Sequence, residues 1–171
     1  MLRILVFVFC FWPLTVFSQL VPAKGIGLQV SLIPAGLHAL MVDNAGRQAI
    51  WSFLGRQGDD WIAELRGGSG EMIRTEHYNA KGYLVELVYG DGGRVKYAPY
   101  RCGDQLGECR YTRTGVDGRK RKFASDVRRT GSTFTVYTDG KASGSYKLGS
   151  YNIRTMQRQG DYWTKLKWIR N

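Results

Sequence analysis

Short runs of alternating apolar and polar residues fill most of this chain, and clusters of glycine, asparagine and aspartate separate them. The clearest set lies between Trp61 and Tyr100, where four runs are interrupted by turn clusters at 67–70, 79–82 and 90–93. β-rich runs broken by turn residues roughly every ten positions are typical of antiparallel all-β proteins. This stretch therefore predicts four consecutive antiparallel strands.

The same pattern continues on both sides of this set. A turn at 43–46 separates runs at 37–42 and 47–54 and predicts a hairpin, with Gly46 at the position that favours positive φ. Further runs follow towards the C-terminus, at 108–114, 119–127, 132–138, 145–148 and 151–157, and a closing strand begins near Tyr162. The chain has no long apolar run with a period of 3.6 residues, so any helix after the N-terminal segment should be short.

These runs predict one antiparallel meander domain of about nine or ten strands, folded as a small barrel or a strongly curved sheet. A two-sheet sandwich is the alternative. The alternation predicts one buried and one solvated face on each strand. Ala49, Trp51 and Phe53 share one face of their run, and in the run 83–89 the residues Leu84 and Val88 share another.

The first 18 residues have the layout of a secretory signal peptide. Arg3 precedes an apolar stretch from Ile4 to Phe17, and Ser18 ends a plausible cleavage site. The apolar stretch is shorter than the roughly 20 residues that span a bilayer, which disfavours an uncleaved anchor. We expect export to the periplasm or the extracellular space, an N-terminal arm over 19–36, and the β domain over 37–171.

Removal of the signal peptide would leave two cysteines, Cys102 and Cys109. In an exported chain such a pair predicts a disulfide, here around a loop of six residues. Two thiols without nearby histidines are too few for a structural zinc site, so we expect no metal.

The distribution of charge along the chain is more informative than its overall composition. The formal net charge is +11, and residues 94–129 alone carry 11 basic and four acidic side chains. Residues 19–93 carry six basic and eight acidic side chains. A basic half beside a slightly acidic half favours one face that meets an anionic partner.

The candidate anion-binding residues all lie within the basic stretch: Arg110, Arg113, Arg119, Lys120, Arg121, Lys122, Arg128 and Arg129. Arginine binds phosphate or sulfate groups in a bidentate manner, and lysine acts as a point charge. Alternation splits the contiguous charges at 119–122 between both faces of a strand, which indicates an edge strand or a protruding hairpin. The competing interpretation is a charged edge that prevents strand-to-strand aggregation.

Signals for catalysis are weak, so an enzyme is not favoured. His77 shares a strand face with Ile73 and Thr75, as structural histidines do. Glu64, Glu76 and Glu86 lie on neighbouring strands and would matter for acid–base chemistry only if the register opposed them. The sequence contains no phosphate-binding glycine loop and no nucleophile elbow, and we expect no cofactor.

The sequence favours an exported, non-enzymatic binding protein whose basic surface contacts an anionic polymer, a lipid headgroup or an acidic protein; nucleic acid is a less favoured partner. The alternative is a barrel that carries a small apolar ligand. Its lumen would be lined by apolar side chains drawn from Trp51, Phe53, Leu84, Val88, Phe134 and Val136. An outer-membrane barrel is a further, less favoured class, because the strands are short and their outward faces carry many charges.

Overall fold

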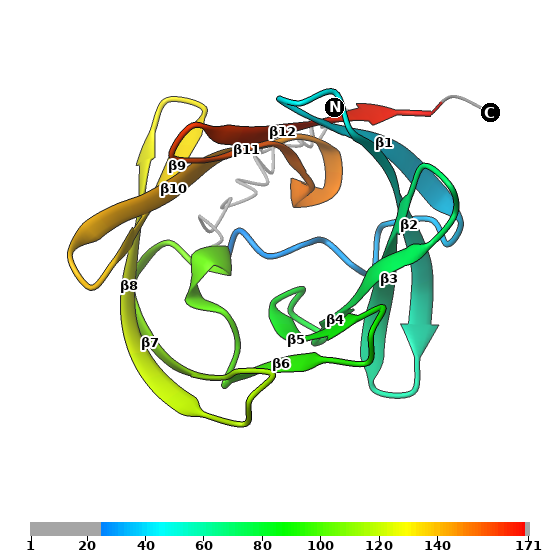
Figure 1. The fold of residues 1–171 in the computed structure, drawn as a ribbon. Coiled ribbons are helices and arrows are strands. Elements are labelled where there is room, and N and C mark those ends of the chain that lie inside the picture. The colour runs from blue at the N-terminus through cyan, green and yellow to red at the C-terminus, as the bar shows by residue number, and fades with distance from the viewer. Residues whose placement is uncertain (1–24, 170–171) are drawn as a thin grey trace, which may run out of the picture.

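Residues 25–169 are described by a computed structural model, and they form a closed antiparallel β-barrel of twelve strands (Figure 1). The strands follow one another around the barrel in chain order, and β12 pairs with β1 to close it. In sequence order they are β1 (Leu37–Asp43), β2 (Gln48–Gln57), β3 (Asp60–Gly67), β4 (Met72–Tyr78), β5 (Leu84–Tyr89), β6 (Arg94–Ala98), β7 (Gly107–Thr114), β8 (Lys120–Thr130), β9 (Thr133–Thr138), β10 (Lys141–Leu148), β11 (Arg154–Gln159) and β12 (Tyr162–Trp168).

The all-β meander predicted from the sequence is confirmed, but the strand number is corrected from nine or ten to twelve. The sheet closes on itself, so the sandwich alternative is wrong. Each of the twelve runs delimited in the sequence, including the short ones at 145–148 and 151–157, forms a strand of its own. Closure gives every strand two hydrogen-bonded neighbours, although the first residues of β8 extend beyond β9 and pair with β7 alone.

The hairpin predicted around residues 43–46 shows how local sequence sets the turns. The Asp43 carboxylate accepts hydrogen bonds from the backbone N–H groups of Ala45 and Arg47, each at 2.9 Å. Gly46 has a φ of +78°, a backbone conformation that residues other than glycine rarely adopt. The aspartate and the glycine therefore fix the loop length and, with it, the register between β1 and β2.

The strand faces follow the predicted alternation where no bulge intervenes. Ala49, Trp51 and Phe53 are all buried in the largest hydrophobic cluster inside the barrel, together with Ala63 and Leu65 of β3. In β5 a register shift opposite Tyr78 breaks the alternation. A bulge of this kind turns side chains on its two sides to the same face of the sheet.

One end of the barrel is closed by the segment 25–36, which enters as the blue trace in Figure 1. Leu28 N–H donates to the Gly82 carbonyl and Gln29 N–H donates to the Tyr151 carbonyl, each at 2.9 Å. Val30 and Ile33 are buried in the core. The arm predicted at 19–36 therefore forms, over its described part, a plug against the β4–β5 and β10–β11 connections. The predicted signal peptide lies outside the described residues.

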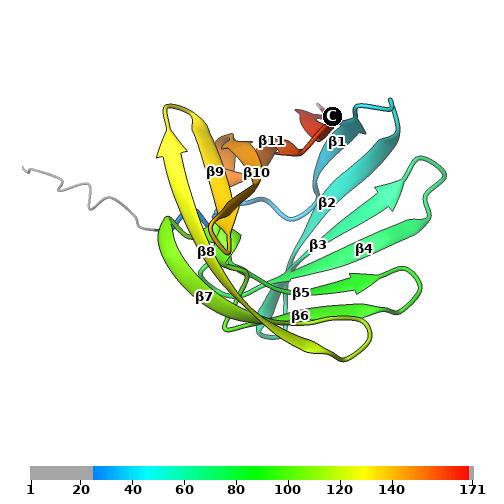
Figure 2. The same ribbon diagram turned by 60° about the vertical axis from the view of Figure 1, so that its left-hand side comes forward.

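Two short 3-10 turns complete the closed end: η1 (Cys102–Asp104) and η2 (Ser150–Asn152). Both turn inwards from the barrel wall in Figure 1, and Figure 2 shows the strands around them from the side. In η2, Tyr151 and Asn152 hold a φ of +57°, and the Asn152 side chain donates to the Gly27 carbonyl at 3.0 Å. These contacts fix the arm against the barrel. At the opposite end lie the hairpin turns β1–β2, β3–β4, β5–β6, β7–β8, β9–β10 and β11–β12.

Candidate binding site in the barrel lumen

A cavity of about 740 Å³ occupies the barrel interior, within the size range of small-molecule sites. Every strand except β5 and β6 contributes lining residues. Asp43, Glu71 and Tyr162 line it near the hairpin turns, so it opens at that end of the barrel. Its deep part reaches Arg74, Arg101, Gly103, Tyr146 and Arg154. A smaller cavity of about 70 Å³ lies beyond these arginines, towards the closed end.

The first polar cluster of the deep part centres on Glu76, which is buried with 7% of its surface exposed. One carboxylate oxygen accepts hydrogen bonds from Arg74, the shorter at 2.6 Å. The other oxygen accepts from the Tyr78 hydroxyl at 2.7 Å and from the Trp51 indole N–H at 3.2 Å. All the hydrogen-bond acceptor sites of this carboxylate are thus occupied, which compensates for the burial of its charge.

Strand geometry explains why these polar side chains meet inside. Arg74, Glu76 and Tyr78 are two residues apart along β4, so the period of two places all three on one face. Register pairs Glu76 with Ala63 and Leu87, both of which are buried. The inward face of β4 is therefore polar although its neighbours are apolar.

The second polar cluster centres on Asp104 in η1, which is buried with 6% of its surface exposed. One oxygen accepts hydrogen bonds from Arg154 at 2.6 Å and from Arg101 at 3.2 Å. The other accepts from the backbone N–H of Leu84 at 3.2 Å. Asp104 therefore ties β5, β11 and the segment before η1 together.

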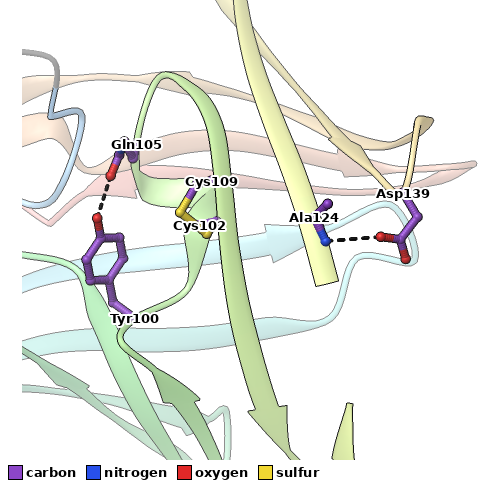
Figure 3. Close-up of a disulfide and its surroundings, with 6 residues drawn as sticks. All are labelled: Tyr100, Cys102, Gln105, Cys109, Ala124 and Asp139. Atoms are coloured by element: carbon purple, nitrogen blue, oxygen red, sulfur yellow. Dashed lines mark hydrogen bonds between the residues drawn. A yellow bond between two sulfur atoms is a disulfide. The ribbon is translucent and has the colours of Figure 1, made fainter. Parts of the chain in front are cut away.

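The disulfide predicted between Cys102 and Cys109 is present and joins η1 to β7 (Figure 3). Tyr100 donates its hydroxyl hydrogen to the Gln105 side chain beside the bridge. Nearby, the backbone N–H of Ala124 in β8 donates to the carboxylate of Asp139, which follows β9, at 3.0 Å (Figure 3). The disulfide thus restrains the loop that carries Gly103 and Asp104 into the lumen.

Arg154 contacts both the loop and the aromatic wall. It donates to the Gly103 carbonyl at 2.8 Å, and its guanidinium lies 4.0 Å from the centre of the Tyr146 ring. Tyr146 donates its hydroxyl hydrogen to the same carbonyl at 2.9 Å and stacks on Phe134. The arginine head is therefore held from three sides.

The buried groups have shifted acidities. Burial alone raises the pKa of Glu76, but the charge of Arg74 and the hydrogen bonds from Tyr78 and Trp51 outweigh it, so this pKa lies below its ordinary value. Burial and the neighbouring Glu76 charge raise the pKa of Tyr78 well above its ordinary value. Burial also raises the pKa of Tyr146 to about 12, against the opposing charge of Arg154. Both tyrosines therefore stay protonated and act as donors at neutral pH.

The eight surface residues predicted to bind anions are all exposed and lie on β7, β8 and their hairpin: Arg110, Arg113, Arg119, Lys120, Arg121, Lys122, Arg128 and Arg129. Arg128 pairs with Asp126 at 2.6 Å, and Arg129 donates to the Gly131 carbonyl. Both lie at the far end of β8, six or more residues from Lys122 and so roughly 20 Å away at strand spacing. The set thus follows two strands and does not form one cluster.

The sequence did not predict that two of these basic residues would lie directly opposite each other in the sheet. Arg113 pairs with Arg121 across the β7–β8 hairpin, and Lys122 pairs with Thr112. Within the described residues, Arg119 is paired with Asp117 at 3.6 Å, whereas Arg113 and Lys120–Lys122 form no ion pair. Within β8 only Ser125–Thr130 pair with β9, whereas Lys120–Lys122 pair with β7 alone, so the basic residues belong to a hairpin that extends beyond the neighbouring strand, as the sequence predicted.

The three glutamates considered for catalysis do not converge. Glu76 pairs with Ala63 and Leu87, whereas Glu64 pairs with Thr75 and Glu86 with His77. The period of two therefore puts Glu76 on the face opposite to the other two. His77 contacts Asp60 at 3.3 Å and is part of neither lumenal cluster.

The lumen predicted for an apolar carrier also needs correction. Val136 lines the large cavity and Trp51 the small one, while Phe53, Leu84 and Phe134 are buried in the clusters around them. Val88 pairs with Thr75 on the other face of the sheet, because the β5 bulge reverses the alternation after Leu84.

The residues that sequence reasoning missed are the deep arginines, Arg74, Arg101 and Arg154. A signal for the first was present, since Arg74-x-Glu76-x-Tyr78 places an ion pair and a tyrosine on one strand face. The sequence offers no comparable signal for Arg101 and Arg154, because only the fold brings β11 against η1.

In residues 25–169, no three histidine, cysteine or acidic side chains are close enough to hold a metal ion. Over the same residues, no helix has the length and apolar character needed to cross a membrane. Comparison of the chain with protein-family models, curated proteins and solved structures finds no match.

Proposed function

We propose that this protein is a non-enzymatic binding protein that holds a small molecule inside its barrel. The observation that carries this proposal is the cavity of about 740 Å³, enclosed by the wall of a closed barrel and open at the hairpin end. Cavities of this size bury most of a small ligand, and barrel interiors are a common place for them.

The lining favours an amphipathic ligand over a purely apolar one. Met41, Ala49, Leu65 and Val136 supply apolar wall, and polar side chains supply the mouth and the deep end. A purely apolar ligand would leave the deep polar groups desolvated without new hydrogen bonds, which costs free energy. The proposed ligand therefore has both an apolar body and polar groups.

A lumen-filling substitution tests this proposal. Thr164 lines the cavity, and the adjacent Lys165 is exposed on the outer face of β12. We expect Thr164→Trp to weaken binding of the fluorescent neutral probe N-phenylnaphthylamine by about tenfold or more, because the indole occupies the space that a ligand needs. Lys165→Trp should leave the affinity unchanged. Equal affinity in both variants would place the probe outside the lumen and contradict the proposal.

A second candidate function is contact between the protruding β7–β8 hairpin and an exported or envelope polyanion. The observation that favours it is the direct pairing of Arg113 with Arg121, since like charges opposite each other cost stability unless an anion lies between them. Binding of heparin that falls steeply between low and moderate salt would support this function. Arg113 is two residues from Tyr111, which lines the cavity, so the paired arginines share the lumenal strand face and this contact would lie beside the mouth of the barrel.

A further inference from the structure

The deep end of the lumen carries more positive than negative charge. Three guanidinium groups, from Arg74, Arg101 and Arg154, reach the large cavity and also line the smaller one behind it. Two carboxylates, Glu76 and Asp104, accompany them. Three positive and two negative charges leave an excess of one positive charge in a partly desolvated site.

Most of the acceptor capacity of the two carboxylates is already used. Glu76 accepts hydrogen bonds from Arg74, Tyr78 and Trp51, and Asp104 accepts from Arg101, Arg154 and the Leu84 backbone. Glu76 uses all four of its acceptor sites and Asp104 uses three, so an acid group from a ligand would supply the acceptors that three arginines still lack.

Arg101 is the arginine with a buried donor that has no acceptor in the described part of the chain. Its guanidinium donates one hydrogen bond to Asp104 at 3.2 Å, and its Nε is buried without a partner, the single such side-chain atom within residues 25–169. A buried donor without an acceptor costs free energy. Glu76 raises the pKa of Arg74, while the charge of Arg101 acts in the opposite direction, so the two guanidinium groups are close enough to repel.

We infer that the deep end of the lumen binds the acid group of an amphipathic monoanion, with Arg101 as its main donor. The inference rests on the proposed lumenal function. Carboxylates, sulfonates and phosphate esters share this chemistry, since each offers planar or trigonal oxygens to an arginine fork. The less polar body of the ligand would lie towards Met41, Leu65 and Val136, between the arginines and the mouth.

The competing explanation is that the arginines only brace the closed end of the barrel. A brace and a binding site differ in one measurable property, which is discrimination between two ligands that differ only in an acid group. Anilinonaphthalene sulfonate and N-phenylnaphthylamine form such a pair, because they share a ring system and only the first carries a sulfonate. Their fluorescence reports binding to each protein variant directly.

The experiment titrates the full chain, Arg101→Met and Arg66→Met with both probes. Arg66 is the matched control because it is exposed on β3 and pairs with Glu64 outside the lumen. Loss of a charge-assisted hydrogen bond is worth about tenfold or more in affinity. We therefore expect Arg101→Met to lose about tenfold or more for the sulfonate and less than about twofold for the neutral probe. Arg66→Met should change neither affinity.

Each other outcome overturns a distinct statement. If neither probe binds the unsubstituted protein, the proposed function fails. If both probes bind equally and Arg101→Met changes neither, the lumen binds ligands but the acid-group inference is wrong. If Arg66→Met weakens the sulfonate as much as Arg101→Met, binding follows net charge and the inference also fails.

A competition experiment covers the case in which Arg101→Met does not fold. With the unsubstituted protein, decanoate should displace bound N-phenylnaphthylamine at a concentration about tenfold lower than decanol does. Equal displacement would overturn the inference without any variant. Decyl sulfate and decyl phosphate in the same assay rank the acid groups and so distinguish a carboxylate ligand from a sulfate or phosphate ligand.

Discussion

The deep lumen and the protruding β7–β8 hairpin both carry several arginines, but the two regions hold them in different ways. Inside, Arg74 and Arg154 contact the buried carboxylates of Glu76 and Asp104 at 2.6 Å. On the hairpin, Arg113 lies opposite Arg121 without an acidic partner among the described residues. The deep charges are thus fixed by geometry, and the exposed hairpin charges are solvated and screened by salt. A high density of positive charge alone therefore does not identify a binding site.

The strongest way to break this comparison is to remove the inner carboxylate Glu76. In Glu76→Ala, Arg74, Tyr78 and Trp51 lose their shared acceptor, and breaking a buried pair costs about 3 kcal/mol or more of unfolding free energy. Urea denaturation followed by tryptophan fluorescence measures this loss. The control Glu64→Ala removes a carboxylate paired with exposed Arg66, and we expect a change of less than about 1 kcal/mol. Equal losses would mean that the inner network is no more important than a surface pair.

This contrast also shows how far the sequence could go. Alternation and turn residues were sufficient for an all-β meander, for the inward face of Ala49, Trp51 and Phe53, and for the Cys102–Cys109 pair. These features depend on neighbours within a few residues or on composition. The deep site depends on residues far apart in the chain, such as Asp104 and Arg154, which only barrel closure brings together.

β-Bulges set a second limit on how well the strand faces could be predicted from the sequence. A single register shift in β5 reverses the face of the residues that follow it, so the placement of Val88 in the lumen was wrong although Leu84 was placed correctly on an inward face. An ideal period of two contains no information on where a bulge occurs. The sequence left the inward face of β4 unassigned for another reason, because an ion pair such as Arg74–Glu76 is also typical of a solvated strand face.

The next largest effect should follow from removing the disulfide. The bridge closes a short loop, and the loop-entropy estimate gives about 2 kcal/mol of unfolding free energy for its loss. We expect the double variant Cys102→Ser, Cys109→Ser to lose this amount in urea denaturation. Because η1 carries Asp104, the same variant should weaken sulfonate-probe binding more than neutral-probe binding. Unchanged discrimination between the two probes would show that the loop holds its position without the bridge.

A smaller effect should appear with pH. The pKa of Glu76 is lower in the folded protein than in the unfolded chain, so its contribution to stability is complete above the ordinary value of about 4.3 and is lost as the pH falls through the lowered value. The measurement compares urea midpoints of the unsubstituted protein and Glu76→Gln over the range from neutral to about pH 3. The difference between them should shrink on acidification. A difference that stays constant would mean that the ionised form is not preferred in the fold.

The smallest effect on stability should come from the β7–β8 hairpin, where Ser replaces all of Arg119–Lys122. These side chains are exposed, and exposed charges contribute about 0.5 kcal/mol or less each. Removing Arg121 also relieves its repulsion from Arg113, so the unfolding free energy should stay level or rise slightly. If this face contacts a polyanion, heparin affinity and its salt dependence should both fall, since fewer counterions are released. The matched control replaces four other exposed lysines with Ser: Lys141, Lys147, Lys165 and Lys167. Heparin affinity that falls equally in both variants would mean that net charge, and not the β7–β8 hairpin, governs heparin binding.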